Sequence, residues 1–213
     1  MKNKKKLSTG KTILNIVLII IFLTLGFLVR NTGEGILFDI KVLEIFHKAT
    51  NPTILSFMKV ISFLGAEKFL VPVMFIVIVY NVAKKKNREA IFLIVNTLGS
   101  FFLNSLIKQV FQRTRPFDFS LVKQGGLSYP SGHSMVVMSM YLALFYLLTK
   151  NQENRNKRIV IGVLAGGYIA MMGISRMYLG VHWPTDIIGG YICGYLLYQT
   201  SKKLIMEKIN IDK

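Results

Sequence analysis

The sequence predicts an all-α integral membrane protein, and two observations carry that prediction. Hydrophobic residues make up 52% of the 213-residue chain and the mean hydropathy is +0.47, both of which are high for a soluble domain. The apolar residues also come in blocks, such as the uncharged run from Thr12 to Val29. A helix of that length crosses about 30 Å of hydrocarbon at roughly 1.5 Å per residue.

Six blocks are predicted to be transmembrane helices of one bundle, so that residues 1–213 form a single membrane-embedded domain. The predicted spans lie near residues 12–30, 67–83, 88–111, 133–150, 157–176 and 184–202. The first block is long and no small-residue cleavage site follows Val29, so it is interpreted as a retained helix rather than a signal peptide. Residues 31–66 are amphipathic and interrupted by charges. Interfacial or re-entrant helices are therefore expected between the first and second spans, with a break at Asn51-Pro52.

The basic residues predict the orientation of the bundle. A net charge of +17 suggests a nucleic-acid ligand in a soluble protein, but here the lysines and arginines cluster between apolar blocks, so no nucleic-acid partner is expected. Of the 27 basic residues, 17 precede the first span or follow the second, fourth and sixth. The positive-inside rule then predicts a multi-pass protein of the cytoplasmic membrane with both termini in the cytoplasm. The connections 31–66, 112–132 and 177–183 are expected to face outward.

Two Gly-x-x-x-Gly pairs lie within predicted spans, at Gly162 and Gly166 and at Gly190 and Gly194. Such pairs form either a dimer face or a close helix contact within one bundle, and the second interpretation is preferred here. The oligomeric state stays open.

The candidate chemistry lies in the connection before the sixth predicted span. His182 and Asp186 are four residues apart and therefore share one face of a helix, where Asp186 can bond one ring nitrogen of His182 and leave the other free to react. Pro184 suits the first turn of that helix, which places His182 at its start. This pattern predicts a histidine prepared as a base or a nucleophile.

A second candidate segment, Pro130-Ser131-Gly132-His133, leads directly into the fourth predicted span. Ser131 is expected to cap that helix, and Gly132 allows the backbone to approach a bound anion closely. Free N–H groups at a helix start suit phosphate. His133 fits the acid that protonates a leaving oxygen, opposite a nucleophilic His182.

Three cations are expected at the same outward end of the bundle. Lys108 lies at the end of the third predicted span, Arg115 follows that span directly before Pro116, and Arg176 closes the fifth. Guanidinium groups grip phosphate oxygens in pairs, so these three side chains and the helix start near Ser131 can together surround a dianionic phosphate.

These residues resemble the three signature motifs of the type 2 phosphatidic acid phosphatase family, the membrane lipid phosphatases related to vanadium haloperoxidases. The motifs are Lys-x6-Arg-Pro at 108–116, Pro-Ser-Gly-His at 130–133 and Ser-Arg-x5-His-x3-Asp at 175–186. All three occur ungapped and in the family's order. The six-span layout extends the resemblance over nearly the whole chain. Short bacterial members, including the phosphatidylglycerophosphate and undecaprenyl pyrophosphate phosphatases, are the most similar.

The resemblance implies a role for each matching position. The residues implied to bind phosphate are Lys108, Arg115, Ser131, Gly132 and Arg176. It further implies that His182 forms a phosphohistidine, that Asp186 orients it, and that His133 protonates the leaving group. No metal and no cofactor are implied, and the sequence has no cluster of carboxylates, Cys or His at ligand spacing beside the site.

The expected function is removal of the terminal phosphate from a lipid at the outer face of the cytoplasmic membrane. Undecaprenyl pyrophosphate, phosphatidylglycerophosphate and phosphatidic acid all stay open as substrates, and so does a lid role for residues 31–66. One alternative keeps the fold but changes the reaction to phosphotransfer between lipids or to hydrolysis of a soluble ester. Another alternative is an anion or proton transporter. Transporters of the inverted-repeat kind have two matching halves, and the sequence shows no such pair.

Overall fold

The structure, a computed structural model, describes residues 2–207, and over that range it is entirely helical and irregular, without strands. The helices are α1 (Lys2–Leu28), α2 (Leu37–Lys48), α3 (Pro52–Leu64), α4 (Glu67–Ala83), α5 (Asn87–Ile94), α6 (Ser100–Phe111), α7 (Gly132–Thr149), α8 (Arg155–Tyr178) and α9 (Pro184–Ser201). Short helical turns lie at Val95–Gly99 (η1), Phe117–Phe119 (η2) and Lys202–Glu207 (η3). The all-α prediction is therefore confirmed.

Four stretches of the described chain are long and apolar enough to cross a membrane: Gly10–Leu28, Asn87–Phe111, Gly132–Thr149 and Arg155–Tyr178. Each agrees within a few residues with a span predicted from the sequence. The second stretch runs continuously through α5, η1 and α6.

A fifth candidate span is the pair α3 and α4, which bends by 43° between the two helices. The sequence prediction of a span at 67–83 covers α4 alone. The structure adds α3 because Asn51 caps it, accepting a bond from the Thr53 N–H at 2.9 Å, and because Pro52 starts its first turn. The predicted break at Asn51-Pro52 is confirmed as the boundary between α2 and α3.

Helix α9 agrees within one residue with the predicted sixth span, but it is not among the stretches that are apolar enough to count as candidate spans. Its position explains the difference, because ten of its residues are buried and it makes its most extensive contact with α7. A Cβ on Gly190 would lie 2.6 Å from the Ser131 carbonyl oxygen, and one on Gly194 would clash with the Met135 carbonyl. A helix enclosed by protein does not need the apolar surface that lipid demands.

Close packing is therefore confirmed for Gly190 and Gly194 and is wrong for Gly166. An added Cβ on Gly166 would meet no atom within 4 Å, because that face of α8 points away from the bundle. A Gly-x-x-x-Gly pattern states that two helices can approach and does not state which face they use.

The hydrophobic core lies between α4, α5, α7 and α8, where Leu70, Phe92, Val136, Met140 and Met172 are buried. A second cluster joins α1 to the segment before α7. There the Tyr129 hydroxyl donates to the Phe22 carbonyl at 2.7 Å, and its ring packs on Phe111. This contact anchors the chain immediately before the α7 start.

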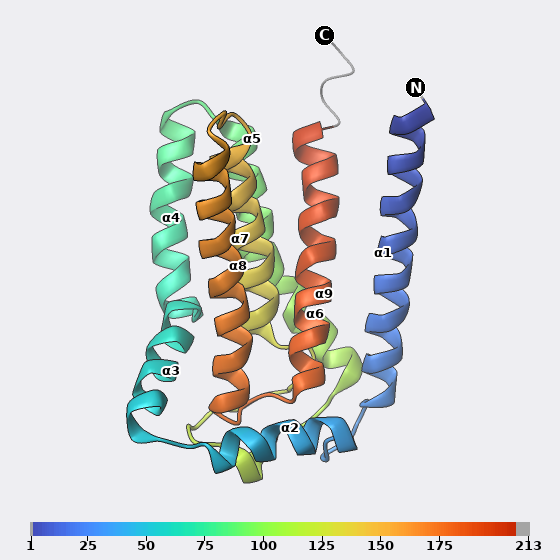
Figure 1. The fold of residues 1–213 in the computed structure, drawn as a ribbon, viewed down its shortest axis with the longest axis vertical. Helices are drawn as coiled ribbons and strands as arrows, with labels where there is room; N and C mark the ends of the chain where they lie inside the picture. The colour runs from blue at the N-terminus through green and yellow to red at the C-terminus, as the bar shows by residue number, and fades with distance from the viewer. Residues whose placement is uncertain (1, 208–213) are drawn as a thin grey trace.

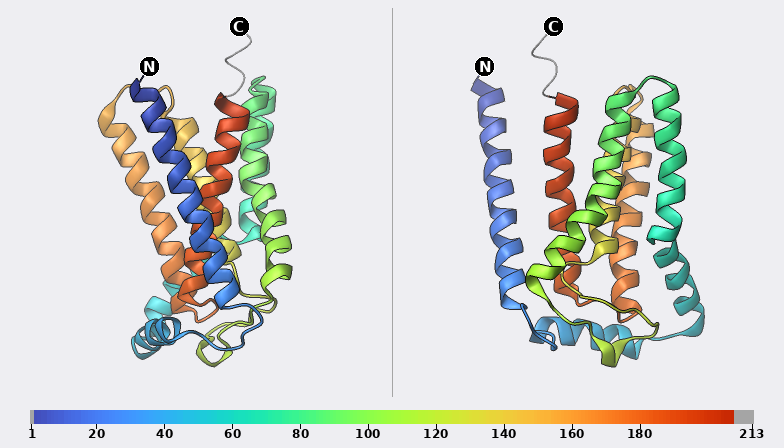
Figure 2. Two further views of the ribbon diagram at one scale, coloured as in Figure 1. Left: turned by 90° about the vertical axis from the view of Figure 1, so that its right-hand side faces the viewer. Right: turned by 180° about the vertical axis from the view of Figure 1, so that it is seen from behind.

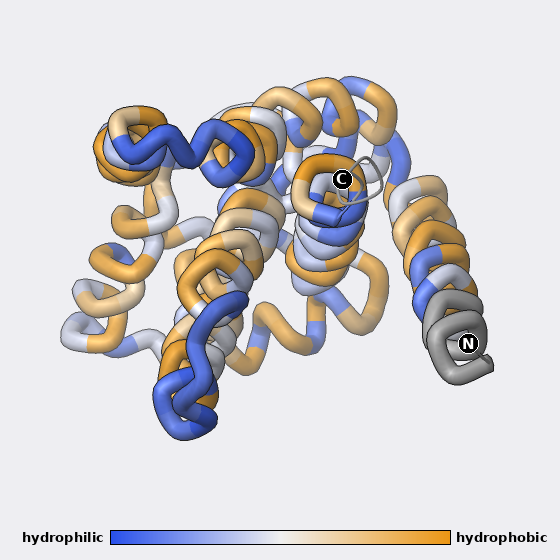
Figure 3. The backbone as a smooth tube through the Cα atoms, turned by 90° about the horizontal axis from the view of Figure 1, so that it is seen from above, coloured by the Kyte–Doolittle hydropathy of each residue, from blue (hydrophilic) through white to orange (hydrophobic). Residues whose placement is uncertain are grey.

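The connections between the helices are divided between two ends of the bundle (Figures 1 and 2). Helix α1 begins at the same end at which α9 finishes, and the α4–α5 and α7–α8 connections lie there too. Seen from that end, these two connections are hydrophilic (Figure 3). Helix α2 lies across the opposite end, together with the α6–α7 and α8–α9 connections (Figure 1). All three sequence motifs therefore reach the end that α2 covers.

Gly180 in the α8–α9 connection should not tolerate a side chain. Its φ is +63°, and an added Cβ would collide with the Phe119 carbonyl. We expect Gly180→Ala to lower the free energy of unfolding by at least about 1–3 kcal/mol, measured as a fall in the melting temperature of the purified protein in detergent. Gly166→Ala, on the open face of α8, is the matched control and should cause no loss. Equal melting temperatures for the two variants would contradict this account of the turn.

Candidate functional site

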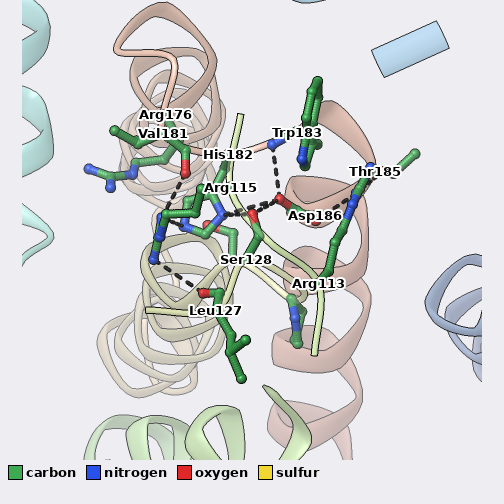
Figure 4. A network of polar contacts seen from close by, with 12 residues as sticks. Arg113, Arg115, Leu127, Ser128, Arg176, Val181, His182, Trp183, Thr185 and Asp186 are labelled. Atoms are coloured by element: carbon green, nitrogen blue, oxygen red, sulfur yellow. Dashed lines mark hydrogen bonds and ion pairs between the residues drawn. The ribbon is translucent and has the colours of Figure 1, made fainter. Parts of the chain in front are cut away.

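The candidate site forms where the α6–α7 segment, the α7 start and the α8–α9 connection meet (Figure 4). Arg115 of the first segment donates from Nη1 to the Val181 carbonyl at 2.6 Å. Ser128, from the same segment, donates to the Asp186 carboxylate. The Ser131 N–H donates to the Asp186 carbonyl at 2.9 Å. The three predicted clusters thus lie side by side.

His182 and Asp186 are in contact, at 3.3 Å between Nδ1 and Oδ2. Helix α9 starts at Pro184, so His182 lies just before the helix and Asp186 in its first turn. The Trp183 N–H donates to Asp186 Oδ2 at 2.9 Å, which ties the carboxylate to the helix start. The other ring nitrogen of His182, Nε2, lies 3.0 Å from Arg115 Nη1.

The charge on His182 follows from its surroundings. The side chain is 1% exposed, and burial lowers the pKa of the imidazole well below its ordinary value of 6.5. The nearby cations Arg115, Lys108 and Arg176 lower this pKa further. His182 is therefore neutral at physiological pH, which is the state in which a ring nitrogen keeps a lone pair for attack.

The three predicted phosphate-binding cations have backbone carbonyls and uncharged side chains as partners. Lys108 donates to the Leu127 carbonyl. Arg115 donates from Nε to the Gly125 and Gly126 carbonyls at 3.0 and 3.1 Å, and burial lowers its pKa to about 10. Arg176 donates to the side chains of Ser62 and Gln124.

These cations leave an excess of positive charge, because the carboxylate that attracts Lys108 and Arg115, that of Asp186, is already paired with Arg113. Within residues 2–207, none of the three forms an ion pair with a carboxylate. Like charges held together in a buried place disfavour one another, and a bound anion relieves that repulsion. The arrangement therefore suits an anion with several oxygens, such as phosphate.

At the α7 start, Ser131 and Gly132 are more closely enclosed by protein than the sequence predicted. Ser131 caps the helix as expected, accepting from the Ser134 N–H at 3.4 Å, but the residue is fully buried and its hydroxyl also accepts from Ser134 Oγ at 3.1 Å. Gly132 lies against the Asn104 side chain, and a Cβ there would be 2.9 Å from Asn104 Oδ1. Phosphate binding by these two residues stays a prediction.

His133, in the first turn of α7, belongs to the same group of charges. It interacts electrostatically with Arg176, Arg115 and Lys108, and also with His182. The structure therefore brings the two predicted catalytic histidines to one place.

Sequence reasoning missed four residues of this site: Asp39, Arg113, Ser128 and Thr185. Arg113 and Asp39 are fully buried and paired with each other at 2.6 Å, and Arg113 also pairs with Asp186 at 2.8 Å. The only sequence signal for Asp39 is a carboxylate between the apolar residues Phe38 and Ile40. Arg113 lies inside the first motif, two residues before Arg115. The sequence does not show which of the two arginines pairs with a carboxylate and which lies beside His182.

Comparisons with known proteins agree with this geometry. A family model described as the PAP2 superfamily matches residues 89–209. A phosphatidylglycerophosphatase B of Bacillus subtilis is 34% identical over 140 residues, which cover 65% of this chain and 68% of that protein. An undecaprenyl-diphosphatase of Sulfolobus acidocaldarius is 26% identical, over 84% of each protein.

Among solved structures, the chain is similar to a transmembrane PAP2-type phosphatidylglycerolphosphate phosphatase from Bacillus subtilis. The TM-score is 0.82 at 30% identity, and the match covers 93% of this chain and 98% of that one. The similarity therefore extends well beyond the segments that carry the three motifs.

The lowered pKa of His182 predicts how stability depends on pH. Below about pH 6.5 the unfolded chain binds a proton at this imidazole that the folded protein does not bind, so stability falls as the pH falls. For one group the slope is at most about 1.4 kcal/mol per pH unit. Melting temperatures of the wild type and of His182→Gln between pH 5 and 7.5 isolate this contribution, and the wild type should lose more. Parallel curves would show that His182 titrates normally.

Proposed function

The chain belongs to the PAP2 superfamily, and on that premise we propose that it is an integral membrane phosphatase that hydrolyses the terminal phosphate of a lipid phosphate or pyrophosphate. Membership confirms the resemblance drawn from the three motifs. Enzymes of this family are hydrolases of phosphate esters, which favours this function over an anion or proton transporter.

One observation carries the proposed mechanism: a neutral histidine, held by a carboxylate on one side, faces unpaired cations on the other. An arginine can only donate, so Nε2 of His182 accepts from Arg115 while Nδ1 keeps its proton and donates to Asp186. The lone pair of Nε2 therefore points toward Arg115, on the side of the ring where the cations lie. A phosphate bound there takes over the Arg115 donor and exposes its phosphorus to Nε2.

The reaction would proceed by double displacement. Nε2 of His182 attacks phosphorus, the P–N bond forms as the bond to the leaving oxygen breaks, and His133 gives that oxygen a proton. Water then attacks the phosphohistidine and passes its proton to His133, and inorganic phosphate leaves. Lys108, Arg115 and Arg176 stabilise the charge on the phosphoryl oxygens in both steps.

The support for a lipid substrate is the position of the site and the identity of the relatives. The site lies at the ends of apolar helices, where a chain can stay in the bilayer while the headgroup meets the cations. Relatives are named for phosphatidylglycerophosphate and undecaprenyl diphosphate. Both compounds, together with phosphatidic acid, are the substrates to compare.

We further propose six spans: α1, the bent pair α3–α4, α5–α6, α7, α8 and α9. Helix α2 would lie at the membrane surface as an interfacial helix. The start of α1, the end of α9 and the basic α4–α5 and α7–α8 connections share one end of the bundle, and the positive-inside rule supports a cytoplasmic location for that end. The site then opens at the outer face of the cytoplasmic membrane.

The same phosphohistidine can pass its phosphoryl group to a lipid hydroxyl instead of water. Product analysis with and without an added acceptor lipid separates hydrolysis from this phosphotransfer.

The mechanism predicts that His182→Ala loses phosphate release by about 1,000-fold or more, because the nucleophile is gone, while the protein stays folded. The assay is phosphate release in detergent with EDTA present, with undecaprenyl pyrophosphate, phosphatidylglycerophosphate and phosphatidic acid compared. His47→Ala, which removes an exposed imidazole on α2, is the control and should match the wild type. Near-normal release by His182→Ala would exclude a phosphohistidine at this position, and no release by the wild type from any of the three would contradict the proposed function.

The orientation predicts the side from which single cysteines react. In a Cys193→Ser background, Lys123→Cys, at an exposed position of the α6–α7 segment, should react with a membrane-impermeant maleimide added to intact cells. Lys86→Cys, in the exposed α4–α5 connection, should react only after the cells are opened. The reverse pattern would invert the topology.

A further inference from the structure

Arg113 is fully buried between two carboxylates that come from distant parts of the chain. Its Nη2 donates to Asp39 Oδ2 at 2.6 Å, and its Nη1 donates to Asp186 Oδ1 at 2.8 Å. All three side chains are 0% exposed. Nε of Arg113 has no hydrogen-bond partner among the described residues, so the two terminal nitrogens carry the whole interaction.

Thr185 bonds to both Asp39 and Arg113. Its backbone N–H donates to Asp39 Oδ1 at 2.9 Å, and its hydroxyl donates to Asp39 Oδ2 at 2.9 Å while accepting from Arg113 Nη1 at 2.7 Å. Asp39 is therefore bonded on both oxygens. Helix α2 is fastened by these bonds to the first turn of α9, the turn that carries Asp186.

Trp183 closes the network from one side. The Arg113 guanidinium lies 5.2 Å from the centre of the indole ring, and the indole N–H donates to the Thr114 carbonyl at 3.2 Å. Gly35, just before α2, packs so closely on this ring that a Cβ would clash with it. The start of α2 thus rests on the residue that follows His182.

Buried ion pairs are a poor way to gain stability, because both charges lose their hydration. A network of two acids and one base also carries a net negative charge, and holding α2 against the bundle does not need such a charge. Its location offers a reason. Arg113 occupies Asp186 Oδ1, so the carboxylate cannot rotate, and Oδ2 is left to Ser128, the Trp183 N–H and His182.

We propose that Asp39, Thr185 and Arg113 are positioning residues, which act through Asp186 to hold His182 in line for attack and make helix α2 part of the catalytic apparatus. This inference rests on the proposed phosphatase function. In it, Arg113 keeps Asp186 ionised while positive charge develops on the phosphorylated imidazole, and Asp39 and Thr185 hold Arg113 in place. Neither Asp39 nor Thr185 bonds to the cations Lys108, Arg115 and Arg176.

Asp39→Asn tests the outer end of this chain of contacts. It keeps the shape of the side chain and removes its charge. We expect kcat to fall by about 10–100-fold with little change in KM, since the phosphate-binding cations are untouched. Glu44→Gln removes an exposed carboxylate from the same helix and should leave both constants at their wild-type values.

Arg113→Gln tests the link to Asp186. Without the arginine, the carboxylate takes up a proton at a higher pH, so the acid limb of the kcat/KM profile should move to higher pH. The charged and titratable groups around Asp186 are His182, Arg113, Asp39, Lys108, Arg115 and Tyr129. Because Asp39 acts through Arg113, the double variant Asp39→Asn/Arg113→Gln should be no slower than Arg113→Gln alone.

A purely structural role predicts different results. It would reduce the burst amplitude of trapped phosphohistidine, which measures the fraction of competent sites, and would leave the rate per site and the acid limb of the pH profile unchanged. The activity losses of Asp39→Asn and Arg113→Gln would then multiply in the double variant. Those results, or an Asp39→Asn enzyme with the wild-type kcat, would overturn the inference. A wild-type protein that releases no phosphate from any lipid contradicts the proposed function instead, so the two failures are distinguishable.

Discussion

The carboxylate of Asp186 is the group on which the arrangement of the site depends. A guanidinium from the segment after α6, a hydroxyl from the segment before α7, a backbone N–H at the start of α9 and the imidazole of His182 all meet on its two oxygens. A fully buried carboxylate requires such a set of donors, because an unpaired charge in this environment is very costly. Meeting that requirement brings together parts of the chain that are more than seventy residues apart.

The same site contains a second, opposite imbalance. Lys108, Arg115 and Arg176 lie close enough to interact electrostatically, and uncharged groups rather than carboxylates accept their hydrogen bonds. Carbonyl oxygens satisfy donors without cancelling charge. The site is therefore attractive to an anion, and the loop at 124–128 supplies oxygens that hold these three cations.

Close packing of α7 against α9 supports the site. Glycines of α9 allow its backbone to approach α7, so that the helix carrying Asp186 and the helix carrying His133 are in direct backbone contact. This contact sets the position of the segment with His133 relative to the helix start that follows His182. Helix α2 adds a further contact through Asp39, which bonds to Thr185 in the first turn of α9.

The sequence alone determined the features that depend on local spacing or on the solvent. A long uncharged run has to lie in lipid, so most spans could be assigned to within a few residues. Four residues separate His182 from Asp186, and this spacing at a proline-started helix predicted their contact because helical geometry is local. Ser131 was likewise found as a cap from its place before an apolar run.

Tertiary structure decided which side chains meet across the chain. Asp39 looked like an ordinary charge of an amphipathic helix, and Arg113 like a spacer within a motif, because neither spacing nor composition tells which distant group a buried charge will find. The open face at Gly166 and the bend that joins α3 to α4 were hidden for the same reason. Each depends on the packing of whole helices, and packing is a property of the folded chain rather than of any stretch of its sequence.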